Sequence, residues 1–396
     1  MAIYIYGKAE QKMTMYLMHR DIPTAIVETE RNVPVTYSEI INRNELPIGT
    51  YHENKSTRRL LWDKWVKSRT IPSTRPDIRR LEQFYGKTVS ELFMQSAGIS
   101  LTDGYYFTEN PENRIWDKIN YHKNGFEEAI LKSKMKLWIQ VGQASPDFTT
   151  DGIMDKFWYQ IHGLPYLAKL DKEHHNLLCA NEVFYAKIAG MIGVSCVDYN
   201  LGHFMAEKEK IYYCSCQSFI TNPDEDFITA MQIKHEHMRL DRIGLLDHII
   251  GLGFEKEMRE MMTLDCIFHN TDRHEKNFGI IRHINGSIRM APLYDNGYCF
   301  GINHPNTDKI TDRDMRLLPD SREQILDRYG CEIHIDKDTA LSILEHIYVQ
   351  YQIEDNAYEK AKNELLYGLE LYGKWQQKQH VYGKEYMESE IEYPSL

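Results

Sequence analysis

The dipeptide Asn285-Gly286 stands between two β-rich runs, which is the strongest short-range signal for a β-hairpin. If these two residues form the turn, Asn277 on the first strand faces Tyr294 on the second. Asp295 then lies beside that pair. Cross-strand neighbours are roughly 4.5–8 Å apart, so one hairpin brings the amide of Asn277 and the carboxylate of Asp295 to a common edge.

Asp272 precedes Asn277 by five residues in a polar loop between apolar runs. This is the spacing of the kinase catalytic loop, where the aspartate receives or orients the substrate hydroxyl and the asparagine holds a metal ion. A second metal-binding aspartate is required further along, and Asp295 has that position. Amide and carboxylate oxygens suit Mg²⁺. We therefore predict a catalytic set of Asp272, Asn277 and Asp295, against the alternative of a solvated polar turn.

The chain before this hairpin shows patterns that are typical of strands. The dipeptide His162-Gly163 is expected to join two of them, which places Lys156 opposite Lys169. One helix at 176–190 interrupts the strands, and helical patterns dominate after about residue 220. The expected strands are 136–142, 156–161, 166–170, 197–204 and 211–216.

This order of elements predicts an α+β fold with two lobes, similar in layout to a protein kinase. The N-lobe is expected to hold a five-stranded antiparallel sheet, and the C-lobe is expected to be mainly helical, with a site between them. We expect an N-terminal accessory region at 1–125, an N-lobe at 126–219 and a C-lobe at 220–396. Prolines interrupt the short helical patterns of 1–125, so we expect that region to be irregular.

The stretch 55–80 is rich in lysine and arginine. Residues 58–69 carry apolar side chains at helical spacing, with basic residues on the other faces, among them Arg69. An amphipathic helix with a solvated basic face explains this pattern, and a helix that docks nucleic acid or an acidic partner explains it as well. A weak nucleic-acid contact through 55–80 therefore stays open.

Phosphoryl transfer also needs a cation on the phosphates and backbone donors above them. Lys169 on the third strand, Glu182 on the following helix and the loop 145–152 come in the order that a kinase requires. Each is a weak signal by itself, because a lysine in a strand is usually an edge residue and a glutamate in a helix usually faces solvent. Their common order predicts a Lys169–Glu182 pair and ATP as a cofactor beside Mg²⁺.

Composition excludes some functions. The net charge of −11 argues against nucleic-acid binding by the whole molecule, because phosphate binding requires a basic surface. No apolar run of about 18 residues occurs, and the N-terminus lacks a secretory signal. The 7 cysteines, an odd number spread over 396 residues, suit reduced thiols. We expect a cytoplasmic protein that does not bind membranes.

The run DRHEKNFGII, followed by APLYDNG and preceded by LDCIFHNT, closely resembles the C-terminal domain of HipA-type bacterial serine/threonine kinases. More distantly, it resembles the DRHxxN loop of phosphoinositide-type kinases. SPDFTTDG and the later YLAKL resemble a subgroup of HipA-domain proteins in Gram-positive bacteria. The resemblance is clear over about 140–300 and weaker towards the C-terminus.

This resemblance implies a role for each matching residue. Asp272 is the catalytic base, Asn277 and Asp295 hold Mg²⁺, Lys169 contacts the nucleotide phosphates, and His274 braces the catalytic loop. The phosphate loop departs from the Ala/Gly/Gln-rich loop of the best-known HipA proteins. Its expected phosphate contacts come from Thr149, Thr150 and Gly152, and the adenine is expected at the backbone of Gln217, Ser218 and Phe219.

In this family such kinases act as toxins of toxin–antitoxin pairs or as effectors. The resemblance therefore implies a protein substrate with a Ser or Thr acceptor, an antitoxin-like partner and autophosphorylation at Ser145, Thr149 or Thr150. Other functions stay open: a nucleotide-binding pseudokinase that acts through protein interaction, or a kinase for a small molecule or a lipid. The lipid substrate is weakened by the absence of a membrane-binding helix or a broad polybasic patch in the sequence.

Overall fold

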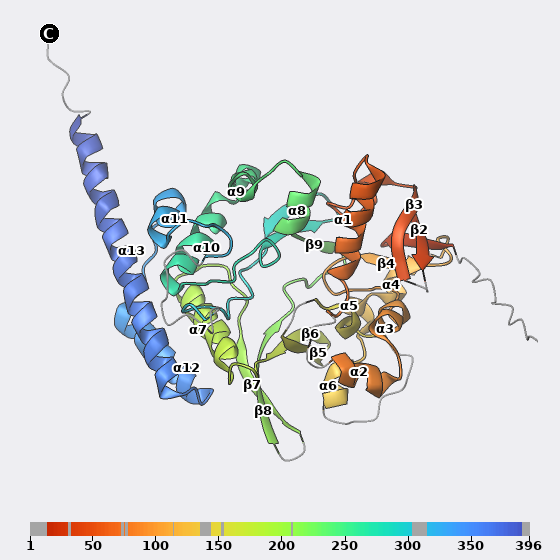
Figure 1. The fold of residues 1–396 in the computed structure, drawn as a ribbon, viewed down its shortest axis with the longest axis horizontal. Coiled ribbons are helices and arrows are strands. Elements are labelled where there is room, and N and C mark those ends of the chain that lie inside the picture. Colours follow the sequence, from red (N-terminus) through yellow and green to blue (C-terminus); the bar gives the residue numbers. More distant parts are fainter. Residues whose placement is uncertain are drawn as a thin grey trace, which may run out of the picture. The chain divides into compact units, whose positions relative to one another are not determined.

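The computed structural model describes residues 14–30, 33–72, 75, 78–113, 115–134, 144–151, 154–206, 209–302 and 315–389 (Figure 1). The chain forms two compact units. The first unit comprises Met1–Ile153, Gln160–Leu164 and Ile220–Asp226, and the second unit comprises Met154–Tyr159, Pro165–Phe219 and Phe227–Leu396. The lobe boundaries near 125 and 219 stay predictions.

The first unit contains a four-stranded antiparallel sheet in the order β3-β2-β1-β4. Its strands are β1 (Met15–His19), β2 (Ile22–Glu30), β3 (Val33–Ile40) and β4 (Tyr105–Thr108). Its helices are α1 (Lys55–Lys67), α2 (Ile78–Tyr85), α3 (Val89–Gln95), α4 (Trp116–Ile119), α5 (Tyr121–Asn124) and α6 (Ala129–Lys134), with short 3₁₀ helices η1 (Arg43–Glu45) and η2 (Pro146–Thr149). The prediction of an irregular accessory region was therefore wrong.

Two prolines of the first unit, of which Pro34 had suggested irregularity, occupy places where a sheet tolerates them. Pro34 lies in β3, which is an edge strand, and pairs with Thr29. Pro23 pairs with Met18 next to a shift of register in the β1–β2 ladder. Because proline cannot donate a hydrogen bond to a ladder, edge strands and bulges are its usual places in sheets. These prolines are compatible with strands after all.

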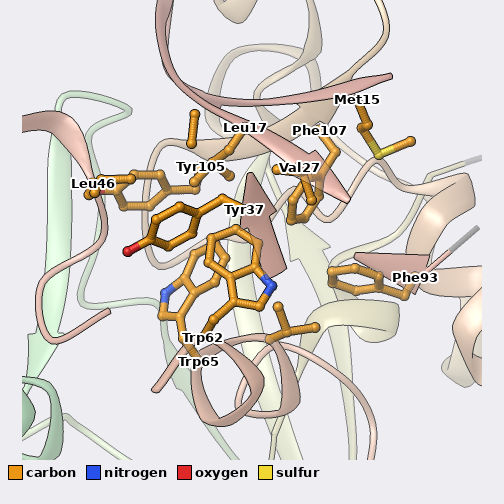
Figure 2. Close-up of a cluster of buried hydrophobic side chains, with 12 residues drawn as sticks. Met15, Leu17, Val27, Tyr37, Leu46, Trp62, Trp65, Phe93, Tyr105 and Phe107 are labelled. Carbon is orange, nitrogen blue, oxygen red and sulfur yellow. The ribbon is translucent and has the colours of Figure 1, made fainter. Parts of the chain in front are cut away.

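Helix α1 packs its apolar face into the aromatic core of the first unit (Figure 2). Trp62 is fully buried, and its ring lies 5.3 Å from that of Tyr37 and 6.4 Å from that of Phe107. Trp65 packs beside Trp62 at 5.2 Å. Edge-to-face contacts of this kind add to the burial of apolar area. The predicted amphipathic helix is confirmed.

Arg69 does not lie on the exposed basic face that the sequence predicts. It is buried, and its guanidinium donates hydrogen bonds to the carbonyl oxygens of Gly98 (2.6 Å) and Tyr105 (3.1 Å). It also forms an ion pair with Asp103. These acceptors compensate the cost of burying the charge, because a buried cation needs partners. The stretch 55–80 therefore exposes fewer cations than its sequence suggests.

A buried ionic cluster fastens residues 220–226 within the first unit. The imidazole of His19 lies 2.6 Å from the carboxylate of Glu45 and 3.0 Å from that of Asp226. Arg20 contacts Asp226 at 2.9 Å, and the N–H of Gly104 donates to it at 3.0 Å. Burial alone would raise the pKa of Asp226, but His19 and Arg20 hold it well below its usual range.

The sheet β5-β6-β8-β7 belongs mainly to the second unit, and the tip of its first hairpin, Gln160–Leu164, is assigned to the first. Its strands are β5 (Asp155–Ile161), β6 (Leu164–Leu170), β7 (Asn200–Ala206) and β8 (Glu209–Gln217). Only His162 and Gly163 separate β5 from β6, and both have positive φ, 51° and 80°, as the predicted two-residue hairpin turn requires. The expected five-stranded sheet is not confirmed: four strands are described, and the strand predicted at 136–142 lies outside the described residues.

Helices make up most of the rest of the second unit. They are α7 (Leu177–Met191), α8 (Ala230–Glu236), α9 (Arg242–Ile249), α10 (Glu255–Phe268), α11 (Arg322–Tyr329), α12 (Lys337–Gln350) and α13 (Asp355–Ser389), with a π-helical turn η3 (Ile250–Phe254) between α9 and α10. The helix predicted at 176–190 is confirmed as α7. In the part of the chain that is described, no helix is both long and apolar enough to span a membrane.

A three-stranded sheet, β11-β10-β9, carries the predicted hairpin. Its strands are β9 (Glu225–Thr229), β10 (Gly279–His283) and β11 (Ile288–Met290). The hairpin exists, but its register is one residue from the prediction, because Ile280 pairs with Met290. The N–H of His283 donates to Ser287, so the loop has three residues and ends at Gly286, whose φ is 86°. The register alone therefore does not place Asn277 beside Asp295.

Gly368 of α13 offers a test of helix packing in the second unit. A Cβ at this position would collide with the main-chain carbonyl of Ile267 in α10. We predict that Gly368→Ala lowers the free energy of unfolding by about 1–3 kcal/mol, the usual cost of overpacking. Gly373→Ala is the matched control in the same helix, because nothing lies within 4 Å of its added Cβ. It should stabilise by up to about 1 kcal/mol through helix propensity. Equal effects in urea denaturation would contradict this packing.

The ionic cluster of Asp226 predicts a pH-dependent stability. A carboxylate whose pKa is depressed by folding stabilises the protein above its unfolded pKa of about 4, and that stabilisation is lost as the pH falls towards the folded value. The melting temperature of Asp226→Asn should fall furthest below that of the wild type at pH 7, and the difference should shrink towards pH 3. Asp224→Asn is the control, with a smaller change expected. A difference for Asp226→Asn that stays constant over this range would refute the assignment.

Candidate active site

Lys169 of β6 is the cation at the centre of the candidate site. Its Nζ is ion-paired with the carboxylate of Glu182 on α7 and lies 2.7 Å from Oδ1 of Asp295. The side chains of Lys169 and Glu182 are 4% and 1% exposed. Burial makes such a pair depend on good geometry, because neither ion keeps its water. The predicted pairing of Lys169 with Glu182 is confirmed, and Asp295 joins it.

The three charges of this cluster set one another's protonation. Burial alone would lower the pKa of Lys169, but Asp295 and Glu182 outweigh it and raise the pKa well above its usual value. Burial raises the pKa of Glu182. Burial acts in the same direction on Asp295, yet Lys169 and Lys156 hold the pKa of Asp295 below its usual range. At neutral pH, Lys169 is therefore positive and Asp295 negative.

The predicted catalytic loop follows α10 and is closed by its own hydrogen bonds. The side-chain amide of Asn277 donates to the main-chain carbonyl of Asp272 at 3.1 Å, and the N–H of Asn277 donates to the carbonyl of His274 at 2.8 Å. The carboxylate of Asp272 accepts a hydrogen bond from Arg316 at 2.5 Å. His274 Nε2 lies 3.9 Å from the same carboxylate. The spacing of Asp272 and Asn277 thus forms a compact turn.

Arg273 lies inside this turn and is 1% exposed. Its Nε donates to Oδ2 of Asp265 at 2.7 Å, and its Nη2 donates to Oδ1 of the same residue at 3.1 Å. This forked contact suits a guanidinium and a carboxylate, because both groups are planar. Tyr185 and Asn270 also donate to Oδ1 of Asp265, at 3.1 and 2.9 Å. A fixed charge pair therefore lies beneath the catalytic loop.

Arg273 also joins two segments of the site. Its Nη1 donates to the carbonyl oxygens of Asn277 (2.9 Å) and Tyr294 (3.0 Å), and its Nη2 donates to the side chain of Asn296 at 2.5 Å. Tyr294 and Asn296 flank Asp295. One guanidinium thus holds the loop of Asp272 and Asn277 against the segment that carries Asp295. The expected neighbourhood of Asn277 and Asp295 depends on this arginine rather than on the hairpin register.

Helix α7 fixes the segment around Asp295 from the other side. The N–H of Asn296 donates to Oε2 of Glu182 at 2.8 Å, and the amide of Asn181 donates to the carbonyl of Gly297 at 2.8 Å. A Cβ on Gly297 would lie 2.9 Å from the carbonyl oxygen of Leu178, so only glycine allows this approach. Glu182 therefore positions both Lys169 and the backbone next to Asp295.

The donor set of this site fits a magnesium ion that arrives with a nucleotide. Among the described residues, no group of three His, Cys, Asp or Glu side chains could hold a metal by itself. Mg²⁺ does not require one, because it keeps several waters and is usually bound through one or two carboxylates plus substrate phosphates. Asp295 offers a carboxylate that is 38% exposed, and Asn277 offers an amide oxygen. The cluster of Lys169 with two carboxylates also carries net negative charge when both are ionised.

The described part of the predicted phosphate loop, 145–151, lies in the first unit and contains η2. The hydroxyl of Thr149 donates to the carbonyls of Ile99 (2.8 Å) and Pro146 (3.1 Å), and that of Thr150 donates to Pro146 at 2.6 Å. Both threonine hydroxyls therefore donate to main-chain carbonyls of their own unit. Gly152 lies outside the described residues. The roles of these three residues stay predictions.

The predicted adenine-binding residues lie at the end of β8. Gln217 pairs with Tyr166 of β6, and the N–H of Ser218 donates to the carbonyl of Pro165 at 2.9 Å. The ring of Phe219 lies 5.3 Å from that of Tyr294. Phe219 thus packs directly beside the segment that leads to Asp295. The structure gives these residues a fixed backbone, and their contact with adenine stays a prediction.

Sequence reasoning missed three functional neighbours of the site: Asp265, Arg273 and Arg316. Asp265 could have been found, because it continues a buried apolar face of α10 formed by Met258, Met261 and Met262. A carboxylate on such a face needs a buried cation. Arg273 gave no such signal, since arginine in a polar loop is usually exposed. Nothing in the sequence connects Arg316 with Asp272.

Residues 148–352 match the family model described as the HipA-like C-terminal domain, which is more than half of the chain. The chain belongs to this family. The match contains the Lys169 cluster, the Asp272 loop and the Asp295 segment. No curated protein matches the chain.

Two solved structures are similar to parts of the chain. One is the Helicobacter pylori proinflammatory kinase CtkA, with 15% identity and a TM-score of 0.43, covering 57% of this chain and 96% of that one. The other is a chain from the Shewanella oneidensis MR-1 toxin–antitoxin complex of HipA, HipB and operator DNA, with 13% identity and a TM-score of 0.43. It covers 90% of this chain and 96% of that one.

The buried pair of Arg273 and Asp265 predicts a large loss of stability on truncation. Arg273→Ala leaves Asp265 without its forked partner in a buried place, which typically costs about 3–5 kcal/mol. Arg328→Ala is the matched control, because Arg328 is 45% exposed and pairs with Asp320 at the surface. That change should cost less than about 1 kcal/mol. Chemical denaturation of both variants measures the difference, and similar losses would contradict the proposed role of Arg273.

Proposed function

We propose that the chain is an ATP- and Mg²⁺-dependent serine/threonine protein kinase of the HipA type, with a bilobal kinase-like arrangement. The observation that carries this proposal is the convergence of Lys169, Glu182 and Asp295 in one ionic cluster. Arg273 holds the loop of Asp272 and Asn277 against the segment of that cluster. A cation, a catalytic carboxylate and oxygen donors for a metal are the parts that phosphoryl transfer requires.

Asp272 is proposed as the group that receives the proton of the acceptor hydroxyl. The hydroxyl oxygen forms a bond to the terminal phosphorus, the bond from that phosphorus to the bridging oxygen breaks, and ADP leaves. The closed turn around Asn277 holds the backbone of Asp272 at its main-chain carbonyl, which limits where its carboxylate can lie. Orientation of this kind contributes more to phosphoryl transfer than covalent chemistry by the protein.

Lys169 is proposed to bind the phosphates of the nucleotide, and Asn277 and Asp295 are proposed to hold Mg²⁺. When bound, the metal neutralises charge that develops on the phosphate oxygens. Glu182 keeps Lys169 extended towards Asp295 and holds the N–H of Asn296. Adenine is proposed at the backbone of Gln217–Phe219, where β8 ends.

The partners of the chain follow from its family as further proposals. They are a protein substrate with a Ser or Thr acceptor, and an antitoxin-like partner if the chain acts as a toxin. A nucleic-acid contact through 55–80 would use the exposed cations of α1, such as Lys67 and Arg59, which are 73% and 62% exposed. Arg69 is buried and does not contribute to such a contact.

Two substitutions separate the roles of base and metal ligand. Asp272→Ala should reduce phosphate transfer from labelled ATP by at least about a hundredfold, because a positioned general base contributes roughly 10²–10⁴-fold. It should still bind Mg²⁺-ATP in a thermal-shift assay. Asp295→Ala should lose both transfer and Mg²⁺-dependent stabilisation by ATP.

Asp338→Ala, which changes an exposed carboxylate of α12, is the control and should behave like the wild type. Undiminished transfer by both Asp272→Ala and Asp295→Ala would remove the kinase assignment. Stabilisation of the wild type by ATP without any turnover would instead favour a pseudokinase.

Autophosphorylation is a separate test of the phosphate loop. Ser145 and Thr149 are buried, whereas Thr150 is partly exposed. We therefore expect Thr150 to be modified first when the wild type is incubated with Mg²⁺-ATP and its phosphopeptides are mapped. Asp272→Ala serves as the control. A map without any modified residue in 145–150 would eliminate this proposal.

A further inference from the structure

Arg316 contacts the candidate catalytic base directly. Its Nη1 donates to Oδ1 of Asp272 at 2.5 Å, and its side chain is 56% exposed. This contact differs from that of Arg273, which is buried and bound on all sides. Because more than half of the Arg316 side chain is exposed, a bound substrate can reach its guanidinium.

The backbone of Arg316 is fixed although its side chain is exposed. Met315 and Leu317, its neighbours in the chain, are buried. The N–H of Arg316 donates to the carbonyl of Thr271 at 3.3 Å, next to Asp272. The guanidinium can therefore leave Asp272 by side-chain rotation alone and still remain beside the catalytic loop.

An acceptor hydroxyl and Arg316 compete for the same carboxylate. The hydroxyl must donate its hydrogen bond to Asp272 before the proton transfers, and Oδ1 of Asp272 already accepts from Arg316. The charge of Arg316 is permanent, because arginine does not deprotonate in proteins. A neutral acceptor would leave the displaced guanidinium without a partner. An acceptor with a carboxylate next to its hydroxyl would supply one, in the forked geometry that arginine prefers.

We propose that Arg316 is a specificity residue that selects protein acceptors whose Ser or Thr is flanked by acidic residues. This inference rests on the proposed kinase function. In a complex with such a substrate, the guanidinium moves from Asp272 to the flanking carboxylate, and the freed Asp272 accepts the proton of the hydroxyl. When the residues beside the acceptor are neutral, Arg316 stays hydrogen-bonded to Asp272 and opposes binding of the acceptor hydroxyl.

His274 also lies near this carboxylate, with its Nε2 3.9 Å from Oδ2 of Asp272. The Arg316 guanidinium is closer to Asp272, with its Nη1 2.5 Å from Oδ1. We therefore place the choice of acceptor on Arg316 rather than on the histidine.

The test uses two matched peptides with one serine, flanked either by glutamate or by glutamine. We compare kcat/KM for Mg²⁺-ATP-dependent transfer by the wild type, Arg316→Ala and Arg316→Lys. The wild type should prefer the glutamate peptide by about tenfold, the size of one charge-assisted hydrogen bond. In Arg316→Ala, kcat/KM should fall by about tenfold for the glutamate peptide and rise by up to about fivefold for the glutamine peptide, where an exposed ion pair no longer competes.

A fall in kcat/KM with the glutamate peptide and a rise with the glutamine peptide distinguish a specificity residue from a structural one. Damage to the fold would lower kcat/KM for both peptides. Arg316→Lys should retain part of the preference, since lysine keeps the charge but not the fork. Equal loss with both peptides, together with a raised KM for ATP, would show that Arg316 serves the nucleotide phosphate and would overturn the proposal. A wild type that transfers phosphate to both peptides without preference would overturn it while leaving the kinase function intact. A wild type that transfers phosphate to no acceptor would overturn both.

Discussion

The buried ion pair of Arg273 and Asp265 is the interaction on which the candidate site depends. A single guanidinium satisfies the carboxylate of Asp265 and binds the carbonyls of Asn277 and Tyr294. Such a pair contributes little net stability compared with an apolar core, because both ions lose their hydration. Its value lies in geometry: five donors in a fixed plane define where two separate loops meet.

The ionic cluster of Lys169, Glu182 and Asp295 depends on the position that Arg273 gives to the neighbouring segment. Once Arg273 has fixed the segment Tyr294–Asn296, the carboxylate of Asp295 meets Lys169, and Glu182 binds both Lys169 and the N–H of Asn296. The close approach of Gly297 to Leu178 completes the contact with α7. The positions of the charges that would face a nucleotide are thus set by groups that never touch it, which is how a preorganised site avoids reorganisation during reaction.

Local sequence patterns predicted the helices and strands of the second unit better than they predicted the register in which the strands pair. The two-residue turn at His162-Gly163, the helix α7 and the Lys169–Glu182 pair were all readable, because alternation and turn chemistry act over short distances. The Asn285-Gly286 hairpin was found, but a three-residue loop shifted its register by one residue. The sheet β3-β2-β1-β4 was missed because its prolines suggested breaks, whereas Pro34 lies on an edge strand, and because β4 comes from far along the chain. Arg273 and Arg316 were missed because burial and contact are tertiary properties.

The most direct test of this account is a crystal structure with Mn²⁺ in place of Mg²⁺ and a non-hydrolysable ATP analogue, located by the anomalous signal of the metal. The account predicts a metal bound by the Asn277 amide oxygen and the Asp295 carboxylate, with Lys169 on a phosphate and Arg273 still on the carbonyls of Asn277 and Tyr294. A nucleotide bound with its metal away from both Asn277 and Asp295 would contradict it.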